Sequence, residues 1–344
     1  MNFMKKSLAL GMAVLMAGSF AACSGADTKW VAKSGDMTVP SGVYIWGLMN
    51  QYYDATSKLG AEVKKPLQEK IDGVPVPEKI VTGAKEDLAK YIAVEKKFSE
   101  LKLSFDAATQ AALTQNVDSY WQYIGDSYEK NGISKDSYAL MFANDAKRAQ
   151  IFQAIYGEGG SEQVPDSELK DKFLKDYAKI IVIPLNFSTS EDPAQKEKDN
   201  KTAKEMIAKY EQKFKAGESM EDLAFEAQKE ISKDPSSLTK PEAGASYTFV
   251  SRDNSPYAEN VTKAIFDAKN GVATVAETDE SIYLFVRYDI SENENDFVSR
   301  KSAILSQLKN EELTNRIAEW AKGLTDVTYN EASLKRYTPD KLKI

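Results

Sequence analysis

The chain has 344 residues, of which 45 are basic, 52 acidic, one cysteine and none histidine, and its formal net charge at pH 7 is −7. The absence of histidine from the sequence excludes imidazole acid–base catalysis, Ser-His-Asp triads and histidine metal sites. The acidic balance argues against a nucleic-acid partner, and no common phosphate loop or calcium loop is present, so we expect no metal and no cofactor. The length fits two or three domains.

Residues 1–22 have the layout of a secretory signal, with two lysines, an apolar run at Leu8–Met16 and small residues after it. The apolar run is shorter than the roughly 20 residues that a membrane-spanning helix needs. Cys23 follows directly and resembles the cysteine of a bacterial lipobox, although Phe20 stands where leucine is usual. The resemblance implies a lipid on the Cys23 sulfur and a protein anchored at the extracytoplasmic face of the cell membrane. An ordinary cleavable signal is the alternative.

Residues 23–176 are predicted to be a mostly helical N-terminal region. Two short extended pieces within Trp30–Val39 flank a turn, and a breaker lies at Val74–Pro77. Apolar residues at helical spacing predict one helix that starts at Ser41 and further helices at Asp87–Lys102, Asn116–Asn131 and Asp136–Tyr156. Another helix is predicted to begin after Val164. Their tyrosine and phenylalanine stripes are more typical of a helical core than of a ligand site.

Residues 177–291 alternate between strands and helices. The pattern predicts strands at Lys179–Phe187, Ser246–Ser251 and Ser281–Tyr288, and helices at Asp192–Ala216, Met220–Ile231 and Ala258–Ala268. Residues 292–344 then read as a polar linker at Asn293–Asp296, a long helix at Phe297–Leu324, an extended piece at Val327–Tyr329 and a basic tail. The fold class is therefore predicted to be α+β.

Four short segments of the middle region match a known family in the same order. They are Glu218–Ala224 after its helix, the Ser232–Ser237 loop, Phe249-Val250-Ser251-Arg252, and Ala264–Gly271. Together they resemble a parvulin-type prolyl isomerase domain. This resemblance implies a small α/β domain with an antiparallel sheet and flanking helices.

The helical flanks extend the resemblance to the extracytoplasmic foldases of the PrsA and SurA type. It implies a SurA-like helical chaperone domain built from the N- and C-terminal segments, with residues 292–344 packing back on the N-terminal region. It also implies unfolded or newly exported polypeptides as partners, and it is compatible with a homodimer.

Parvulin active sites contain two histidines, and this chain lacks both. The position on the first strand falls at Val182 or at Lys179, and the position on the last strand falls near Tyr283. Residues at the family's proline pocket correspond to Val261 and Phe266, with Tyr257 nearby. The resemblance thus implies five peptide-binding candidates: Val182, Tyr257, Val261, Phe266 and Tyr283. The Tyr283 hydroxyl is the one candidate for a catalytic hydrogen-bond donor.

Rotation about an X–Pro bond needs no covalent step, but its barrier of about 18–20 kcal/mol falls only if the twisted amide is bound more tightly than the planar one. Without the histidines, we expect weak catalysis or none. The main hypothesis is a membrane-tethered chaperone that binds unfolded clients. The alternatives are an active prolyl isomerase and a non-catalytic surface lipoprotein with one dedicated partner. A solute-binding lipoprotein is disfavoured, because Asp87–Tyr156 is predicted to be all helical and lacks the strand–helix alternation of two α/β lobes.

Overall fold

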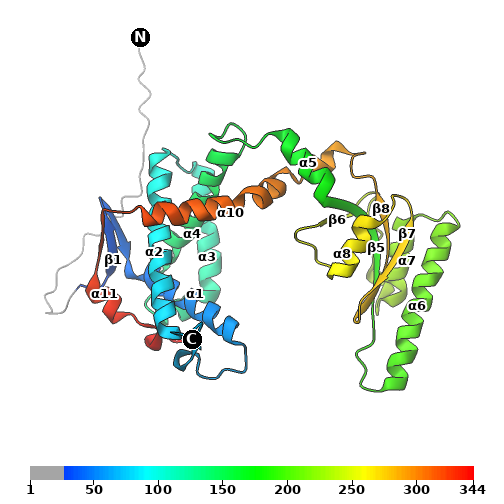
Figure 1. The fold of residues 1–344 in the computed structure, drawn as a ribbon, viewed down its shortest axis with the longest axis horizontal. Coiled ribbons are helices and arrows are strands. Elements are labelled where there is room, and N and C mark those ends of the chain that lie inside the picture. Colours follow the sequence, from blue (N-terminus) through cyan, green and yellow to red (C-terminus); the bar gives the residue numbers. More distant parts are fainter. Residues whose placement is uncertain (1–26) are drawn as a thin grey trace, which may run out of the picture. The chain divides into compact units, whose positions relative to one another are not determined.

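The computed structural model describes residues 27–344, so the predicted signal and Cys23 lie outside the described part. The chain divides into two compact units (Figure 1). The first runs to Gln150 and includes Arg316–Ile344, and the second is Ile151–Asn315. The boundaries predicted at residues 176 and 291 both fall inside the second unit, and they stay predictions.

Strands from both ends of the described chain form a small sheet in the first unit. Its order is β2 (Met37–Pro40), β1 (Trp30–Ser34), β9 (Val327–Tyr329), and both pairings are antiparallel. After β9, Ser333 of α11 (Glu331–Arg336) donates from its hydroxyl to the carbonyl oxygen of Trp30 at 2.6 Å. The last residues of the chain are thus hydrogen-bonded to the first described strand.

Four longer helices accompany this sheet: α1 (Ser41–Leu59), α2 (Val76–Glu100), α3 (Ala107–Lys130) and α4 (Lys135–Tyr156). A short 3₁₀ helix at Pro66–Gln68 and the hairpin of β3 (Lys70–Ile71) and β4 (Val74–Pro75) connect α1 to α2. The predicted start of this helix at Asp87 was wrong, because α2 begins at Val76, about three turns earlier. Pro77 lies in the first turn of α2, where its missing N–H has no helical partner to lose.

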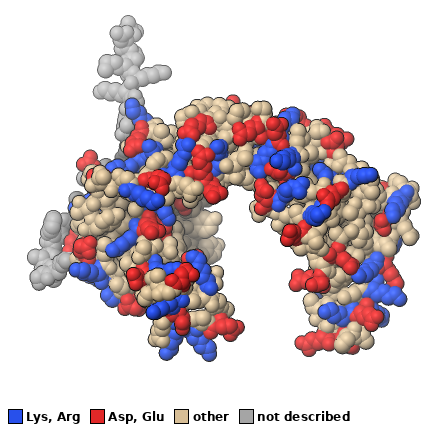
Figure 2. Space-filling model, viewed as in Figure 1, with Lys and Arg blue, Asp and Glu red and all other residues tan. Residues whose placement is uncertain are grey.

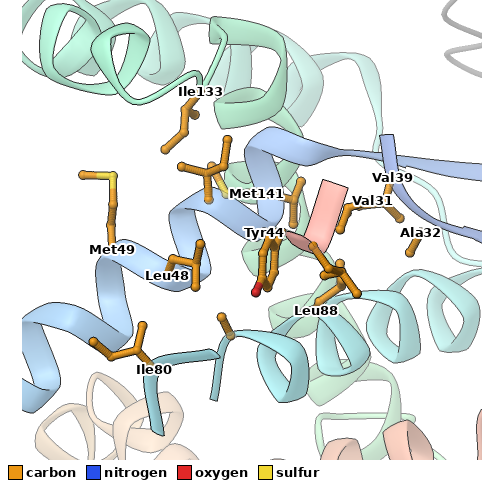
Figure 3. Packing of buried hydrophobic residues seen from close by; sticks show 14 of the residues in the cluster. Val31, Ala32, Val39, Tyr44, Leu48, Met49, Ile80, Leu88, Ile133 and Met141 are labelled. Carbon is orange, nitrogen blue, oxygen red and sulfur yellow. The ribbon is translucent and has the colours of Figure 1, made fainter. Parts of the chain in front are cut away.

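Figure 3 shows the core of the first unit, in which side chains of α1 meet α2, α4 and the β1–β2 hairpin. Those labelled are Val31, Ala32, Val39, Tyr44, Leu48, Met49, Ile80, Leu88, Ile133 and Met141. Gly42 permits a close approach of α1 to α4, because a Cβ atom there would lie 2.6 Å from the Cβ of Ser137. Tyr44 is fully buried, and its hydroxyl has no hydrogen-bond partner among residues 27–344.

The second unit contains a four-stranded sheet in the order β6 (Thr248–Ser251), β5 (Tyr177–Asn186), β8 (Ser281–Tyr288), β7 (Ala273–Glu277), with every pair antiparallel. Its helices are α5 (Asp166–Asp176), α6 (Pro193–Lys215), α7 (Met220–Ile231) and α8 (Glu259–Asp267), with a 3₁₀ turn at Pro235–Ser237. A mixed helix and strand fold with small antiparallel sheets is what the sequence predicted.

Helices cover the sheet on both faces. Ile181, Ile183 and Leu185 of β5 pack on the side of α6 and α7, in one cluster with Leu223. The alternate residues of β5, such as Ile180, pack on the side of α8 with Val261 and Ile265. Burial on both faces explains why β5 reads as a continuous apolar run rather than an alternating one.

The long helix predicted at Phe297–Leu324 is two helices, α9 (Glu294–Val298) and α10 (Lys301–Lys322). α9 begins inside the predicted linker, because the Asn293 side chain accepts a hydrogen bond from the N–H of Asn295 and caps the helix. The interruption between the two helices falls at Arg300, whose guanidinium lies 3.2 Å from the ring centre of Phe249 and donates to the Asp296 carbonyl oxygen. A contact with the sheet therefore accompanies the interruption between α9 and α10, and the apolar periodicity of the sequence does not predict this interruption.

Surface charges of both signs are intermixed over the face drawn in Figure 2. Within residues 27–344, no helix combines the length and the apolar character needed to cross a membrane.

Candidate functional site

The pairing of β5 with β8 defines one face of the sheet. Val182 lies opposite Phe285, and Pro184 lies opposite Tyr283. Since side chains of a strand alternate between faces, these four residues lie on the face that α8 covers in part. Val182 and Tyr283 are half-buried there, whereas Phe285 is fully buried.

The other three candidates come from α8 and the loop before it. Val261 and Phe266 of α8 are buried against the sheet, at 0% and 7% exposure. Tyr257 precedes α8 and contacts Tyr283 edge to face, with ring centres 5.5 Å apart and planes at 87°. All five residues predicted from the sequence are thus in one apolar cluster. Val261 and Phe266 form its base, while the half-exposed Val182, Tyr257 and Tyr283 form its accessible rim.

The rim borders an open strand edge. The N–H of Phe187 donates to the carbonyl oxygen of Glu280, so the odd-numbered residues of β5 direct their backbone groups toward β8 and the even-numbered ones away from it. On that other side β6 pairs with β5 only as far as Ile180. In the described part of the chain, the N–H and C=O of Val182 consequently have no hydrogen-bond partner.

Pro184 lies on the same open edge, so its missing N–H costs the ladder no hydrogen bond. Its ring is exposed on the same face as Val182 and Tyr283. Pro184 was not among the candidates predicted from the sequence, although strict alternation from Val182 places its side chain on this face.

Lys179, the second option for the first-strand position, faces the other way. It pairs with Phe249 and Tyr288 across the sheet and is buried, with its ammonium 2.8 Å from the carboxylate of Asp296. The ammonium also lies 4.1 Å from the ring centre of Tyr247. Lys179 therefore connects the sheet to α9 and contributes nothing to the cluster of the five candidates.

Two arginines flank the base of the cluster. The Arg252 guanidinium lies 4.0 Å from the ring centre of Phe266, and Arg287 donates to the carbonyl oxygen of Phe266 at 2.7 Å. Burial, together with the nearby charge of Arg252, lowers the pKa of Arg287. Burial and the neighbouring phenol of Tyr283 raise the pKa of Tyr257, so this hydroxyl stays protonated at neutral pH.

The side chains of the cluster are apolar or phenolic, so the site offers no group that exchanges a proton near pH 7. What it offers is an apolar surface, two phenol hydroxyls and a free strand edge. A shallow pocket of about 280 Å³ elsewhere in the unit is lined by Glu221, Lys240, Pro241, Ala243 and Ser246, and by none of the five candidates. Residues 27–344 contain no group of three or more acidic or cysteine side chains arranged to hold a metal ion.

No protein-family model and no curated protein matches the chain. Solved structures do. Foldase protein PrsA from Streptococcus pneumoniae is 15% identical, with a TM-score of 0.41 over 74% of this chain and 90% of that one. PrsA from Bacillus subtilis is 18% identical, with a TM-score of 0.33 over 77% of this chain and 94% of that one. Foldase protein PrsA from Lactococcus lactis is 15% identical, with a TM-score of 0.38 over 90% of this chain and 99% of that one.

These three structures are of the foldase type that the sequence motifs resemble. Because every identity is below 20% and every TM-score below 0.5, no activity or partner is transferred from them. The residues of the cluster carry the proposal that follows.

Proposed function

We propose that the protein is an extracytoplasmic chaperone of the foldase type, which binds extended segments of unfolded exported polypeptides at the α8 face of its four-stranded sheet. The observation that carries the proposal is the meeting of Val182, Tyr257 and Tyr283 at one accessible apolar rim beside an unpaired strand edge. In this proposal the helical first unit, with its N- and C-terminal segments, is the SurA-like chaperone domain, and residues 177–291 are the parvulin-like domain.

The chemistry of the rim suits an unfolded chain. An extended segment has free backbone N–H and C=O groups, which can pair with those of Val182. Its apolar side chains can cover Tyr257 and Tyr283, and proline rings pack well on phenol faces. Neither interaction depends on one particular sequence, which is the property that a chaperone with many clients needs.

A client assay tests the proposal. A chemically denatured protein is diluted into buffer with and without the full chain, and aggregation is followed by light scattering. Val182→Asp places a charge on the rim, and it should reduce suppression of aggregation severalfold. Val275→Asp is the matched control, since Val275 is a 41% exposed valine of β7 whose register directs it to the opposite face. Equal suppression by both variants would sink the proposal.

Prolyl isomerase activity is the second candidate, favoured by the position of the Tyr283 hydroxyl at the rim. We expect weak catalysis or none, because the cluster has no imidazole to support the twisted amide. A protease-coupled assay with an X–Pro peptide measures this directly. Acceleration by the wild-type protein that disappears in Tyr283→Phe would replace the non-catalytic proposal with an enzymatic one.

We also propose that a lipid on Cys23 holds the protein at the outer face of the cell membrane. Support comes from the lipobox-like sequence alone, and a test is given in the Discussion.

A further inference from the structure

Helix α3 is exposed but almost free of positive charge. Only Val117 and Gly125 of its residues are buried. Nevertheless, Leu103–Glu129 contains no lysine or arginine, in a chain where 45 of 344 residues are basic. At that frequency, a stretch of this length would hold about three or four basic residues. The first basic residue of the helix is its last, Lys130.

Aromatic rings occupy the face of α3 that meets α4. The ring centres of Tyr120 and Phe142 are 6.1 Å apart, those of Phe142 and Tyr138 are 6.1 Å apart, and Tyr138 lies 5.7 Å from both Trp121 and Tyr128. The rings thus contact one another in a continuous row. We call this row, together with Tyr123, the α3–α4 aromatic surface.

The aromatic surface is accessible at one end. Tyr120 is 53% exposed and Tyr123 is 86% exposed, and the two are one helical turn apart. Trp121, Tyr128, Tyr138 and Phe142 are half-buried. Tyrosine and tryptophan with serine, glycine and asparagine around them are typical of surfaces that recognise protein segments, because rigid rings supply contact area at a low cost in conformational entropy.

Some other aromatic rings of the first unit have a cation of the chain over them. Lys33 lies 4.6 Å from the ring centre of Trp30, and Lys97 lies 4.8 Å from that of Trp320. Within residues 27–344, no lysine or arginine lies over any ring of the α3–α4 aromatic surface. The two exposed rings, Tyr120 and Tyr123, are therefore available to an external cation.

Two acidic residues of the same helix add to this preference. Asp126 follows Tyr123 by one helical turn, and Glu129 follows one turn later. Neither forms an ion pair with another residue of the described chain, whereas Asp118 is paired with Lys135 at 2.8 Å. An anionic lipid surface would be repelled by these carboxylates, so the charge favours a cationic partner.

From these observations we infer that the α3–α4 aromatic surface is a second binding surface, for extended polypeptide segments in which lysine or arginine alternates with apolar residues. The inference rests on the proposed function for its class of partner, but it concerns a different unit and different residues. The rings contact the apolar side chains of the segment and the charged groups of its lysines or arginines, and Asp126 and Glu129 attract the same charged groups.

Peptide titrations test the inference with the full chain. Two fluorescent twelve-residue peptides share the same leucines and phenylalanines, and alternate them with lysine in one and glutamate in the other. Binding is followed by anisotropy for the wild type and for Tyr120→Ser/Tyr123→Ser. Tyr53→Ser is the matched control, because Tyr53 is a tyrosine of α1 with 50% exposure. Circular dichroism checks that each variant is folded.

We expect the lysine peptide to bind at least tenfold more tightly than the glutamate peptide. Tyr120→Ser/Tyr123→Ser should lower the affinity for the lysine peptide by about tenfold, and Tyr53→Ser should change that affinity by less than about twofold. Asp126→Asn/Glu129→Gln should lower the affinity for the lysine peptide severalfold. It should also reduce the dependence of this affinity on salt concentration, since fewer charges remain to be screened.

The outcomes separate this inference from the proposed function. If the affinity for the lysine peptide is lowered by Val182→Asp and not by Tyr120→Ser/Tyr123→Ser, the sheet face is the binding site and this inference is overturned. If neither peptide binds the wild type while Val182→Asp still lowers the suppression of aggregation, this inference alone fails; if the wild type does not suppress aggregation either, both proposals fail. If the wild type is a dimer that Tyr120→Ser/Tyr123→Ser converts to a monomer, the surface binds a second copy of the chain, which also overturns the inference.

Discussion

Replacing Tyr44 with phenylalanine removes a single oxygen from the core of the first unit. The ring is fully buried, and its hydroxyl finds no partner among residues 27–344. A buried polar group without a hydrogen bond costs about 1–3 kcal/mol. The apolar contacts of the ring are kept in the variant. Tyr44→Phe should therefore raise the unfolding free energy of the first unit by about 1–2 kcal/mol at pH 7.

The same hydroxyl makes a prediction at high pH. Burial raises the pKa of Tyr44 to about 12, against 10.0 ordinarily. A raised pKa means that the folded state holds its proton more tightly than the unfolded state. The resulting stability is complete below pH 10 and is lost as the pH rises toward 12, by roughly 3 kcal/mol in all. Tyr44→Phe should lack this part of the decline.

Urea unfolding followed by tryptophan fluorescence is the assay. All four tryptophans of the chain, at positions 30, 46, 121 and 320, lie in the first unit. Their emission thus reports this unit alone. Ser333→Ala is the control, because it removes a buried hydroxyl that does have a partner, and it should cost about 1 kcal/mol. If Tyr44→Phe destabilises the unit as much as Ser333→Ala does, the hydroxyl is satisfied and the reasoning fails.

Three further predictions concern other parts of the chain. Lys179→Met removes the ion-pair partner of the Asp296 carboxylate, which is only 15% exposed and keeps one long hydrogen bond from Asn293, so we expect a loss of about 3 kcal/mol in thermal unfolding followed by circular dichroism. Adding Asp296→Asn should recover most of this loss, and a single-variant loss below about 1 kcal/mol would contradict the reasoning. Gly42→Ala should destabilise the first unit, because the added Cβ collides with Ser137 of α4. Gly47→Ala is the control, since its Cβ meets only ordinary contacts and alanine gains up to about 1 kcal/mol in helix propensity. Equal unfolding free energies of the two variants, measured by tryptophan fluorescence, would refute the packing argument. Cys23→Ala should release the protein from membranes and abolish incorporation of labelled palmitate, and a variant that stays membrane-bound would disprove the lipid anchor.

Most elements of the second unit, β7 excepted, were predictable in their order because the helices are amphipathic and β5 and β8 are rich in β-branched and aromatic residues. The face of β5 was harder to predict. Its residues are buried on both sides, so the apolar run carries no alternation that distinguishes Val182 from Lys179. Only the register with β8 places Val182 beside Tyr283 and turns Lys179 toward Asp296.

Elements that depend on distant contacts were missed or misread. β7 has the sequence Ala-Thr-Val-Ala-Glu, whose alanines have little intrinsic preference for a strand, and it is held by its pairing with β8. The interruption before α10 coincides with the stacking of Arg300 on Phe249, about 50 residues earlier in the chain. Tertiary contacts of this kind leave no local signal in the sequence.

The pairing of β1 with β9 has a consequence for the order in which the molecule is completed. Lys33 pairs with Thr328, so the small sheet of the first unit needs residues separated by almost the whole chain. The second unit is continuous in sequence and needs no residue beyond Asn315. During synthesis, the second unit can therefore fold first, whereas β1 can complete its sheet only after β9 has been made. A chain cut short before Val327 should keep the four-stranded sheet and leave the edge of β1 unpaired, which hydrogen exchange at the amides of Trp30–Ser34 would reveal.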